Sequence, residues 1–430
     1  MALKHQAPRG TRDLLPDELP RWQWVEARAR DVLARYGYRE IRTPVFEDYE
    51  LFARTSGEAS DVVQKEMYRF KDLGDRDLAL RPEFTAGTLR AYLEHSLSGQ
   101  GRVHRLWSMG PVFRYGRPQK GRYRQFWQLN AELVGSPAPA ADVEVIALFV
   151  DLFEAWGFSN LAVAVNSLGT PATRRAYGDA LRKWLEPVRE RLSADSQQRL
   201  ATNPMRVLDT KDPKDHELMQ SVGAAMPHML DTLDDAARTH WNGVLEGLKA
   251  LGIAHDVDHG LVRGLDYYTH TAFEVHDRSL GAQSALGGGG RYDGLIEMLG
   301  GPPTPGVGFA IGLDRALLVL EERGFQPPVA AGGVFIVAME ATRALALSLA
   351  RELRREFAVE IDVDARAFGA QMKTAGRSGA RWALILGEDE VKRGEVTLKD
   401  LASGEQTTFP RARLVETLRA GAPPLAKEPR

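Results

Sequence analysis

The chain contains no cysteine among its 430 residues, which excludes disulfides, thiolate metal sites and a cysteine nucleophile. No apolar run approaches the roughly 20 residues that cross a bilayer. The amino-terminal residues also lack the apolar stretch of a signal peptide. A formal net charge of −2 provides no general attraction to nucleic acid. We therefore expect a globular cytoplasmic protein without a membrane segment, in which any site for a polyanion is a local patch.

The residue composition and the predicted secondary structure change three times along the chain, which predicts several domains. Strand and glycine signals dominate both sides of a central region that is helical and rich in Arg, Asp and Leu. A Pro- and Gly-rich stretch, "FQPPVAAGG", then precedes apolar strands that alternate with helical patterns, as in a small α/β domain. The predicted divisions are one domain in two parts (1–169 and 253–326), a helical insertion (170–252), a linker (327–333), an α/β domain (334–420) and a disordered tail (421–430).

The segment "FRYGRPQKGRYRQFWQ" concentrates positive charge in a chain that is otherwise balanced. Five basic residues fall within the eleven positions from Arg114 to Arg124, and the segment contains no acid. Arginine forks match phosphate oxygens, and the following Phe126 offers a face for a nucleobase. Gln128 and Glu132 alternate in phase with Phe126 along a predicted strand, so all three face one side. The pattern indicates a site for a nucleotide beside a polar small molecule, although a solvated hairpin remains the alternative.

Arg315, in "GFAIGLDRALL", falls in the first turn of a predicted helix. The partial positive charge of a helix amino terminus and a guanidinium both favour a phosphate. The alternative is a surface arginine that pairs with Glu321 or Glu322.

The stretch "LRPEFTAG" places Arg81 and Glu83 on one face of a predicted strand, with Thr85 shortly after. A carboxylate and a hydroxyl in this arrangement can hold a substrate ammonium group. The alternative is a structural ion pair between Arg81 and Glu83.

The stretch "LVRGLDYYTHTAFE" brings Arg263, Tyr267 and Tyr268 into close succession. Arg263 can stabilise charge that develops on a phosphate, and Tyr268 can hydrogen-bond a polar ring. Tyrosines on a strand are also common core residues, which is the alternative here.

The four glycines at 287–290 fit neither of the common nucleotide-binding glycine fingerprints, and we expect them to let a ligand approach the backbone closely.

Taken together, these stretches resemble the class II aminoacyl-tRNA synthetases. "YGYREIRTPVFED", "FRYGRPQKGRYRQFWQ" and "GVGFAIGLDR" resemble motifs 1, 2 and 3 of the class. "LVRGLDYY" and "GGGGRYDGL" resemble the motifs of the histidyl-tRNA synthetase family, and "RGTRDLLPDE" matches as well. The resemblance implies an α+β fold: a catalytic domain built on an antiparallel sheet, a helical insertion and a carboxy-terminal α/β anticodon-binding domain. It also implies a homodimer, because the proline of motif 1 lies at the dimer interface in this class.

The resemblance also assigns roles to individual residues. Arg114 and Arg263 would act as the catalytic residues on opposite sides of the ATP α-phosphate. Gln119 would contact the tRNA acceptor end, and Trp127, where the family often has histidine, faces away by alternation. The implied histidine-binding residues are Glu83, Thr85, Arg114, Gln128, Glu132, Arg263, Tyr267 and Tyr268. The implied ATP-binding residues are Arg114, Arg122, Phe126 and Arg315.

The implied reaction has two steps. Histidine's carboxylate displaces pyrophosphate from ATP, and a ribose hydroxyl at the 3′ end of tRNA(His) then takes the histidyl group. Mg²⁺ should accompany ATP, held mainly by phosphates, and the sequence does not identify its protein ligands. A regulatory paralogue that binds the first enzyme of histidine biosynthesis is the alternative. That paralogue usually lacks the carboxy-terminal domain and some of the residues that a synthetase needs. This chain has the domain and keeps Arg114, Arg122, Arg263 and Arg315.

Overall fold

The computed structural model describes residues 5–57, 60, 62–118, 120–210, 212–263, 267–279, 285–327, 332–364 and 366–421. The chain forms two compact units, residues 1–326 and 327–430. Gln119, the predicted tRNA contact, lies outside the described residues, as does most of the predicted tail. Each unit is considered by itself below.

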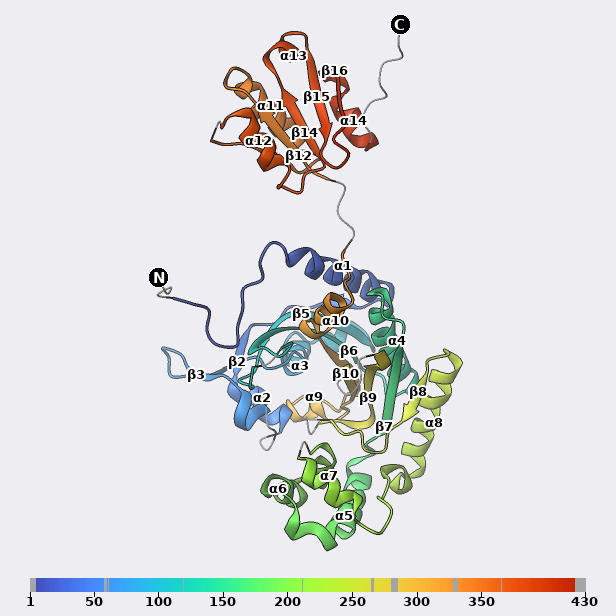
Figure 1. Cartoon of the computed structure of the whole chain (residues 1–430). Coiled ribbons are helices and arrows are strands. Elements are labelled where there is room, and N and C mark those ends of the chain that lie inside the picture. The colour runs from blue at the N-terminus through green and yellow to red at the C-terminus, as the bar shows by residue number, and fades with distance from the viewer. Residues whose placement is uncertain are drawn as a thin grey trace. The chain divides into compact units, whose positions relative to one another are not determined.

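The larger unit is built around an eight-stranded sheet (Figure 1). Its five central pairings are antiparallel, and only the two edge pairings are parallel. This confirms the predicted antiparallel sheet. The strands, in spatial order, are β1 (Arg39–Glu40), β5 (His104–Phe113), β6 (Gln125–Val134), β11 (Gly306–Gly312), β10 (Ala285–Arg291), β9 (Thr269–Asp277), β7 (Leu161–Ser167) and β8 (His255–Val257).

One face of this sheet packs against helices α1 (Leu19–Arg35), α4 (Pro139–Ala155) and α10 (Leu313–Glu322). Alternation along β6 sends Leu129, Ala131 and Leu133 into the core on this side. Helix α4 is apolar on nearly every face, since α8 (Asp235–Ala250) covers the side that the sheet does not. The even-numbered residues of β6 therefore face the opposite side, where the cavity lies.

That opposite side is bounded by helix α3 (Thr85–Glu94) together with a small antiparallel sheet and two short helices. The prediction that Glu83 lies on a strand is wrong. The strand ends at Leu80 and α3 begins at Thr85, so Glu83 lies in the connection just before a helix. The further elements are β2 (Phe46–Asp48), β3 (Arg69–Lys71), β4 (Asp77–Leu80), α2 (Tyr49–Ser56) and α9 (Leu295–Met298).

Between β7 and β8 the chain forms helices α5 (Pro171–Leu185), α6 (Ala194–Thr202), α7 (Pro213–Gln220) and α8. Each is directly preceded by a residue whose side chain accepts a backbone N–H, which is the usual way to satisfy a helix amino terminus. These N-caps are Thr170, Ser193, Asp212 and Asp234. A separate small core of leucines and valines holds part of this region together.

The smaller unit contains a five-stranded sheet in which two parallel pairings are followed by two antiparallel ones. Helices cover it, as the alternating pattern predicts. Among the described residues of the chain, no helix is both long enough and apolar enough to cross a membrane. The strands are β13 (Val359–Ile361), β12 (Val334–Ala338), β14 (Trp382–Leu386), β15 (Glu395–Asp400) and β16 (Gln406–Pro410); the helices are α11 (Arg343–Leu353), α12 (Phe368–Ala375), α13 (Glu388–Lys392) and α14 (Leu414–Ala420).

Candidate active site

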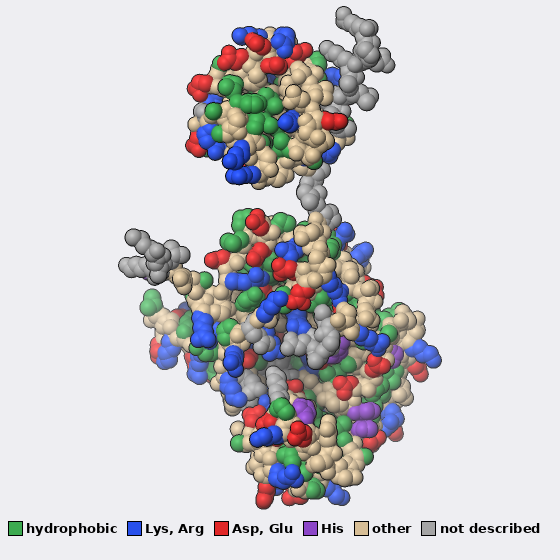
Figure 2. Space-filling view, in the orientation of Figure 1, with side chains coloured by type: hydrophobic (Ala, Val, Ile, Leu, Met, Phe, Trp, Pro, Cys, Tyr) green, Lys and Arg blue, Asp and Glu red, His purple; other side chains and the backbone are tan. Residues whose placement is uncertain are grey.

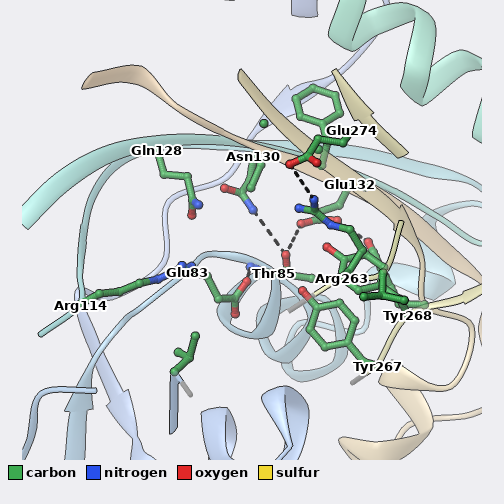
Figure 3. Close-up of a pocket in the computed structure, with 18 of the residues that line it drawn as sticks. Glu83, Thr85, Arg114, Gln128, Asn130, Glu132, Arg263, Tyr267, Tyr268 and Glu274 are labelled. Carbon is green, nitrogen blue, oxygen red and sulfur yellow. Dashed lines mark hydrogen bonds and ion pairs between the residues drawn. The ribbon is translucent and has the colours of Figure 1, made fainter. Parts of the chain in front are cut away.

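A cavity of about 310 Å³ lies over the polar face of the large sheet. This volume is at the lower end of the range for small-molecule sites. Strands β6, β9, β10 and β11 contribute to its lining, and the start of α3 closes one side (Figure 3). The predicted residues that line it are Glu83, Thr85, Arg114, Gln128, Glu132, Arg263, Tyr267 and Tyr268.

Glu83 is held at the amino terminus of α3 by backbone N–H groups of the first helical turn. Its carboxylate accepts the N–H groups of Thr85 at 2.5 Å and Ala86 at 2.9 Å. Complete burial raises the pKa of Glu83, while these two N–H groups and the nearby Arg114 oppose the rise. The carboxylate is thus fixed in orientation before any ligand arrives.

Glu132 is the most enclosed acid of the cavity and is 1% exposed. Thr85 donates its hydroxyl to Glu132 Oε1 at 2.7 Å, and the Tyr292 hydroxyl donates to Oε2. Burial raises the pKa of Glu132 to about 8, although both hydrogen bonds act in the opposite direction. A carboxyl group with this pKa changes charge near neutral pH, which is typical of residues at functional sites.

Two amide side chains on β6 present open acceptors beside these acids. Asn130 donates to the Thr85 hydroxyl at 3.4 Å. Gln128 Oε1 and Asn130 Oδ1 are buried and have no hydrogen-bond partner among the described residues. Because a buried polar atom without a partner costs free energy, the floor of the cavity is suited to a ligand that donates hydrogen bonds.

Arg114 and Arg263 approach the cavity from opposite sides (Figure 3). Arg114 Nε donates to the carbonyl of Pro82 at 2.9 Å. Arg263 Nη1 lies 3.5 Å from Glu274 Oε1. Two partly buried guanidinium groups that face one cavity can neutralise a phosphate placed between them.

The two tyrosines form the wall next to Arg263. Their ring centroids are 4.6 Å apart, and the Arg263 guanidinium lies 6.0 Å from the Tyr268 ring. Burial raises the pKa of both hydroxyl groups, so each stays a neutral hydrogen-bonding group at ordinary pH. Tyr268 can therefore donate to, or accept from, a polar ring.

The glycines of β10 leave room for neighbouring side chains and strands. A Cβ on Gly288 would lie 3.0 Å from Arg263 Nη1 and 2.4 Å from the Phe273 carbonyl. A Cβ on Gly290 would lie 2.8 Å from a carbon of the Tyr268 ring. The access of a ligand to the backbone stays a prediction; what the structure shows is that these glycines make room for Arg263 and Tyr268.

The predicted ATP residues Arg122, Phe126 and Arg315 are not among the residues that line this cavity. Phe126 lies next to it, with its ring 5.7 Å from the Arg114 guanidinium. Arg315 is in the first turn of α10, and its Nε donates to the Ala285 carbonyl at 3.3 Å. Arg122 is exposed to solvent. Figure 2 shows one face of the larger unit, on which many Lys and Arg side chains are exposed.

Comparison with known proteins agrees with this geometry. The family model described as "Histidyl-tRNA synthetase" matches residues 10–316, and that described as "Anticodon binding domain" matches residues 333–421. The chain belongs to the histidyl-tRNA synthetase family. It is 51% identical over 415 residues to the histidine–tRNA ligase of Synechococcus sp. (strain JA-3-3Ab), covering 96% of this chain and 98% of that protein.

Solved structures show the same synthetase fold. The apo histidyl-tRNA synthetase of S. aureus superposes with a TM-score of 0.80 at 37% identity, covering 96% of this chain and 99% of that one. A Bacillus halodurans protein described as "ATP phosphoribosyltransferase regulatory subunit/histidyl-tRNA synthetase" reaches a TM-score of 0.63 at 25% identity, covering 87% and 97%. The family and the class II catalytic fold predicted from the motifs are therefore confirmed.

Several residues that line this synthetase cavity were not found from the sequence. Asn130 could have been predicted, because it lies between Gln128 and Glu132 on the same face of the strand. Tyr292 stands in "GGGGRYDG" but reaches Glu132 only through the pairing of distant strands. Glu274 on β9 and Asp209, in the helical segment between β7 and β8, carried no local signal.

Arg81, by contrast, takes no part in the site. Its guanidinium donates to the backbone carbonyls of Pro111 and Thr43, both at 2.9 Å, and stacks over the Phe84 ring at 4.2 Å. The structural role given above as the alternative for Arg81 thus holds, although its partners are carbonyls and not Glu83.

Proposed function

We propose that this chain is a histidine–tRNA ligase that activates histidine with ATP and then transfers it to tRNA(His). The observation that carries the proposal is that Glu132 and Tyr268 line the same cavity as Arg114 and Arg263, which approach it from opposite sides. A polar, enclosed end suits an imidazole ring, and opposed cations suit an α-phosphate.

The amino acid would occupy the buried end. Glu83 and Thr85 would hold its ammonium group, with Gln128 nearby. Glu132 would accept one ring N–H of the imidazole, Tyr268 would bind the other ring nitrogen, and Tyr267 would form the pocket wall. Because an apolar analogue would leave these buried groups unpaired, such a pocket rejects it strongly.

ATP would extend from this pocket toward the basic loop between β5 and β6. Arg114 would bind the α-phosphate and the histidine carboxylate, Arg263 would act from the opposite side, and Phe126 would stack on adenine. Arg122 and Arg315 would bind the β- and γ-phosphates. A carboxylate oxygen of histidine attacks the α-phosphorus, the bond to the β-phosphate oxygen breaks, and pyrophosphate leaves with its electron pair. Positioning and charge neutralisation by these side chains are sufficient for this step.

Mg²⁺ would neutralise charge on the ATP phosphates. Among the described residues there is no group of three or more His, Cys, Asp or Glu side chains suited to a metal ion. One carboxylate with substrate phosphates is nevertheless a common way to hold Mg²⁺, and Glu274, half-buried on the wall, fits that requirement.

The second step would transfer the histidyl group to the 3′-terminal ribose of tRNA(His). The ribose hydroxyl attacks the adenylate carbonyl, and AMP leaves. Gln119 would contact the acceptor end, and the smaller unit, which matches the anticodon-binding family, would bind the anticodon.

The regulatory paralogue is the second candidate, and the name of the Bacillus halodurans protein includes that role for a related fold. The opposed Arg114 and Arg263 and the anticodon-binding unit favour the ligase, because a regulator has no need of either.

We further propose a homodimer in the cytoplasm. Exposed apolar side chains gather around the small sheet of the larger unit, where a partner would cover them. They include Val45, Phe46, Phe70 and Leu73. A size measurement should give about twice the 47.6 kDa chain mass; a clean monomer would contradict the dimer.

The deciding experiment is amino-acid-dependent ATP–pyrophosphate exchange with each of the twenty amino acids and Mg²⁺. We expect exchange with histidine alone. Exchange with a different amino acid would mean that the roles of Glu132 and Tyr268 are wrong. No exchange with any amino acid would reject the ligase and favour the regulator.

A further inference from the structure

Asp314 stands between two parts of the ATP site that are far apart in sequence. It is the second residue of α10 and directly precedes Arg315. Its side chain is 5% exposed, and one oxygen accepts the backbone N–H of Trp127 at 2.7 Å. Trp127 directly follows Phe126, the residue proposed to stack on adenine, and Asp314 directly precedes Arg315, which is proposed to bind phosphate. One hydrogen bond therefore links the two segments that carry these residues.

The other carboxylate oxygen of Asp314 faces the amino-terminal segment of the chain. Arg12 Nη2 lies 3.4 Å from it, and the same guanidinium also donates to Glu18 at 3.2 Å. The guanidinium further covers the Tyr123 ring at 4.8 Å, near the end of the basic loop. Asp314 and Arg12 therefore connect the amino terminus, the basic loop and α10.

A second set of contacts attaches the same segment to the loop. The backbone N–H of Arg124 donates to the Gly10 carbonyl at 2.7 Å. Gly10 has φ +86°, and a Cβ there would lie 2.7 Å from Arg124 Cγ, so the close approach requires glycine. The carbonyl of Arg124 in turn accepts the backbone N–H of Arg114 at 2.9 Å. The amino-terminal segment thus lies against the part of the loop that carries the proposed phosphate ligands.

Burying the carboxylate of Asp314 costs free energy, which an uncharged residue at this position would avoid. Desolvation raises the pKa of its carboxyl group, and the Trp127 N–H and Arg12 oppose that rise. A buried carboxylate is retained at a cost in free energy, which suggests a function in geometry. On the opposite face of β6 the Trp127 ring packs against Trp22 with ring centroids 5.5 Å apart, so the backbone N–H that binds Asp314 belongs to a residue whose side chain is packed against the core.

We infer that Asp314 is a positioning residue for ATP, which sets the distance between Phe126 and Arg315 by tying β6, α10 and the segment at Arg12 together. The inference rests on the proposed ATP-binding roles of those two residues. It predicts an effect on ATP and not on histidine, because Glu83 and Glu132 have bonding networks of their own.

The test is Asp314→Asn, compared with Asp277→Asn as a matched control. Asp277 is equally buried, accepts a backbone N–H at 2.9 Å from Ser279, and pairs with Arg323, which is 33% exposed like Arg12. We expect Asp314→Asn to raise the KM for ATP in the exchange assay about tenfold, the scale of a lost charged hydrogen bond. The KM for histidine should stay within about twofold. Asp277→Asn should leave both constants unchanged.

A second variant, Arg12→Gln, covers the case in which Asp314→Asn does not fold. It retains the Asp314–Trp127 bond and changes a half-exposed side chain, so we expect a smaller rise, about threefold, in the KM for ATP. The rise in the double variant should be smaller than the two single effects combined, since the Arg12–Asp314 contact is changed in both. Equal rises for ATP and histidine, an unchanged KM for ATP, or the same rise in Asp277→Asn would overturn the inference.

The increase in melting temperature that Mg·ATP produces serves as a readout independent of activity. We expect Asp314→Asn to reduce this increase and Asp277→Asn to preserve it. If the unmodified protein shows no histidine-dependent exchange, the proposed function fails. The melting experiment then decides the positioning role separately: an equal response in both variants overturns it, and a selective loss supports it.

Discussion

The two ends of the proposed site differ in how their side chains are held. At the histidine end, Glu132 is 1% exposed and bonded to Thr85 and Tyr292, and Glu83 is bonded to two backbone N–H groups. At the phosphate end, Lys120 and Arg122 are exposed, and Lys120 pairs with Glu322 on the surface. The side chains of the histidine end are held by hydrogen bonds before any ligand binds, while those of the phosphate end are long, charged and exposed to solvent.

This difference follows from what each ligand demands. Discrimination between amino acids requires desolvated groups whose hydrogen bonds are completed only by the correct side chain. Phosphates are highly charged, so long basic side chains that are exposed to solvent can attract and bind them. Substitutions at the two ends should therefore differ in which kinetic constant they change.

The largest effect should come from Arg114, which lies between the two ends. We expect Arg114→Ala to lower kcat for adenylation by about 100- to 1,000-fold, because the proposed role of Arg114 is charge stabilisation at the α-phosphate. Single-turnover formation of the adenylate measures this directly. Arg117→Ala is the control, since Arg117 is an exposed cation of the same loop; an equal loss in both would show that only total loop charge matters.

Glu132→Gln should act on histidine alone. The amide keeps the size of the side chain but replaces a carboxyl group that can ionise with one acceptor oxygen and an NH2 group, so we expect the KM for histidine to rise about 10- to 100-fold. The KM for ATP should remain unchanged in the same exchange assay. Glu144→Gln, which removes an acid paired with Arg105 on the outside of the unit, should change neither. A parallel rise in both constants would contradict a separate histidine end.

The raised pKa of Glu132 also makes stability depend on pH. In the unfolded chain a glutamate has its ordinary pKa of 4.5, whereas here burial raises the pKa to about 8. Between these values the folded state binds more protons than the unfolded state, so this group's contribution to stability falls as pH rises. Glu132→Gln lacks this pH dependence. The free energy of unfolding of the variant relative to the unmodified protein should increase between pH 5 and 8, by at most about 1.4 kcal/mol per pH unit.

Urea unfolding of both proteins at several pH values measures this relative free energy. All other titrating groups are shared, so they cancel in the comparison. A difference that stays flat across the range would mean that Glu132 is ionised in the free protein at neutral pH.

At the phosphate end, Arg122→Ala should raise the KM for ATP about five- to tenfold and leave the KM for histidine unchanged. The effect is smaller than that of Arg114 because Arg122 is exposed and would contact only the outer phosphates. Exchange assays with varied ATP measure it. No effect of Arg122→Ala would remove Arg122 from the ATP site.

Lys120→Ala should have the smallest effect. Its ion pair with Glu322 is fully exposed, and such pairs are screened by water and salt. We expect unchanged exchange kinetics and an unchanged melting temperature at about 0.15 M salt. A clear loss of ATP affinity would show that this pair shapes the loop.

Much of the fold could be predicted from local patterns. The alternation along 125–134 predicts both that Phe126, Gln128 and Glu132 share a face and that Trp127 faces away, and Trp127 packs against Trp22 on the core side. The hairpin around the basic loop appears as β5 and β6. The roles given to the site residues remain predictions, since they came from the family resemblance.

Other features depend on contacts that no local pattern contains. The sequence places Glu83 on a strand because Pro82 does not reveal where α3 begins. Tyr292 and Glu132 are 160 residues apart and meet only because β10 and β6 both pair with β11. Asp314 looks like an ordinary first-turn acid in the sequence, and its contact with Trp127 appears only when α10 packs beside β6.

The sequence by itself therefore determined the family, the order of its motifs and the side of each strand that carries polar residues, because a period of two is a local property of the chain. Only the tertiary structure decided which acids are buried together, which pKa values rise, and which backbone groups hold Glu83 and Asp314. Those properties depend on desolvation and on distances between segments far apart in the chain, and both arise only when the sheet and helices pack.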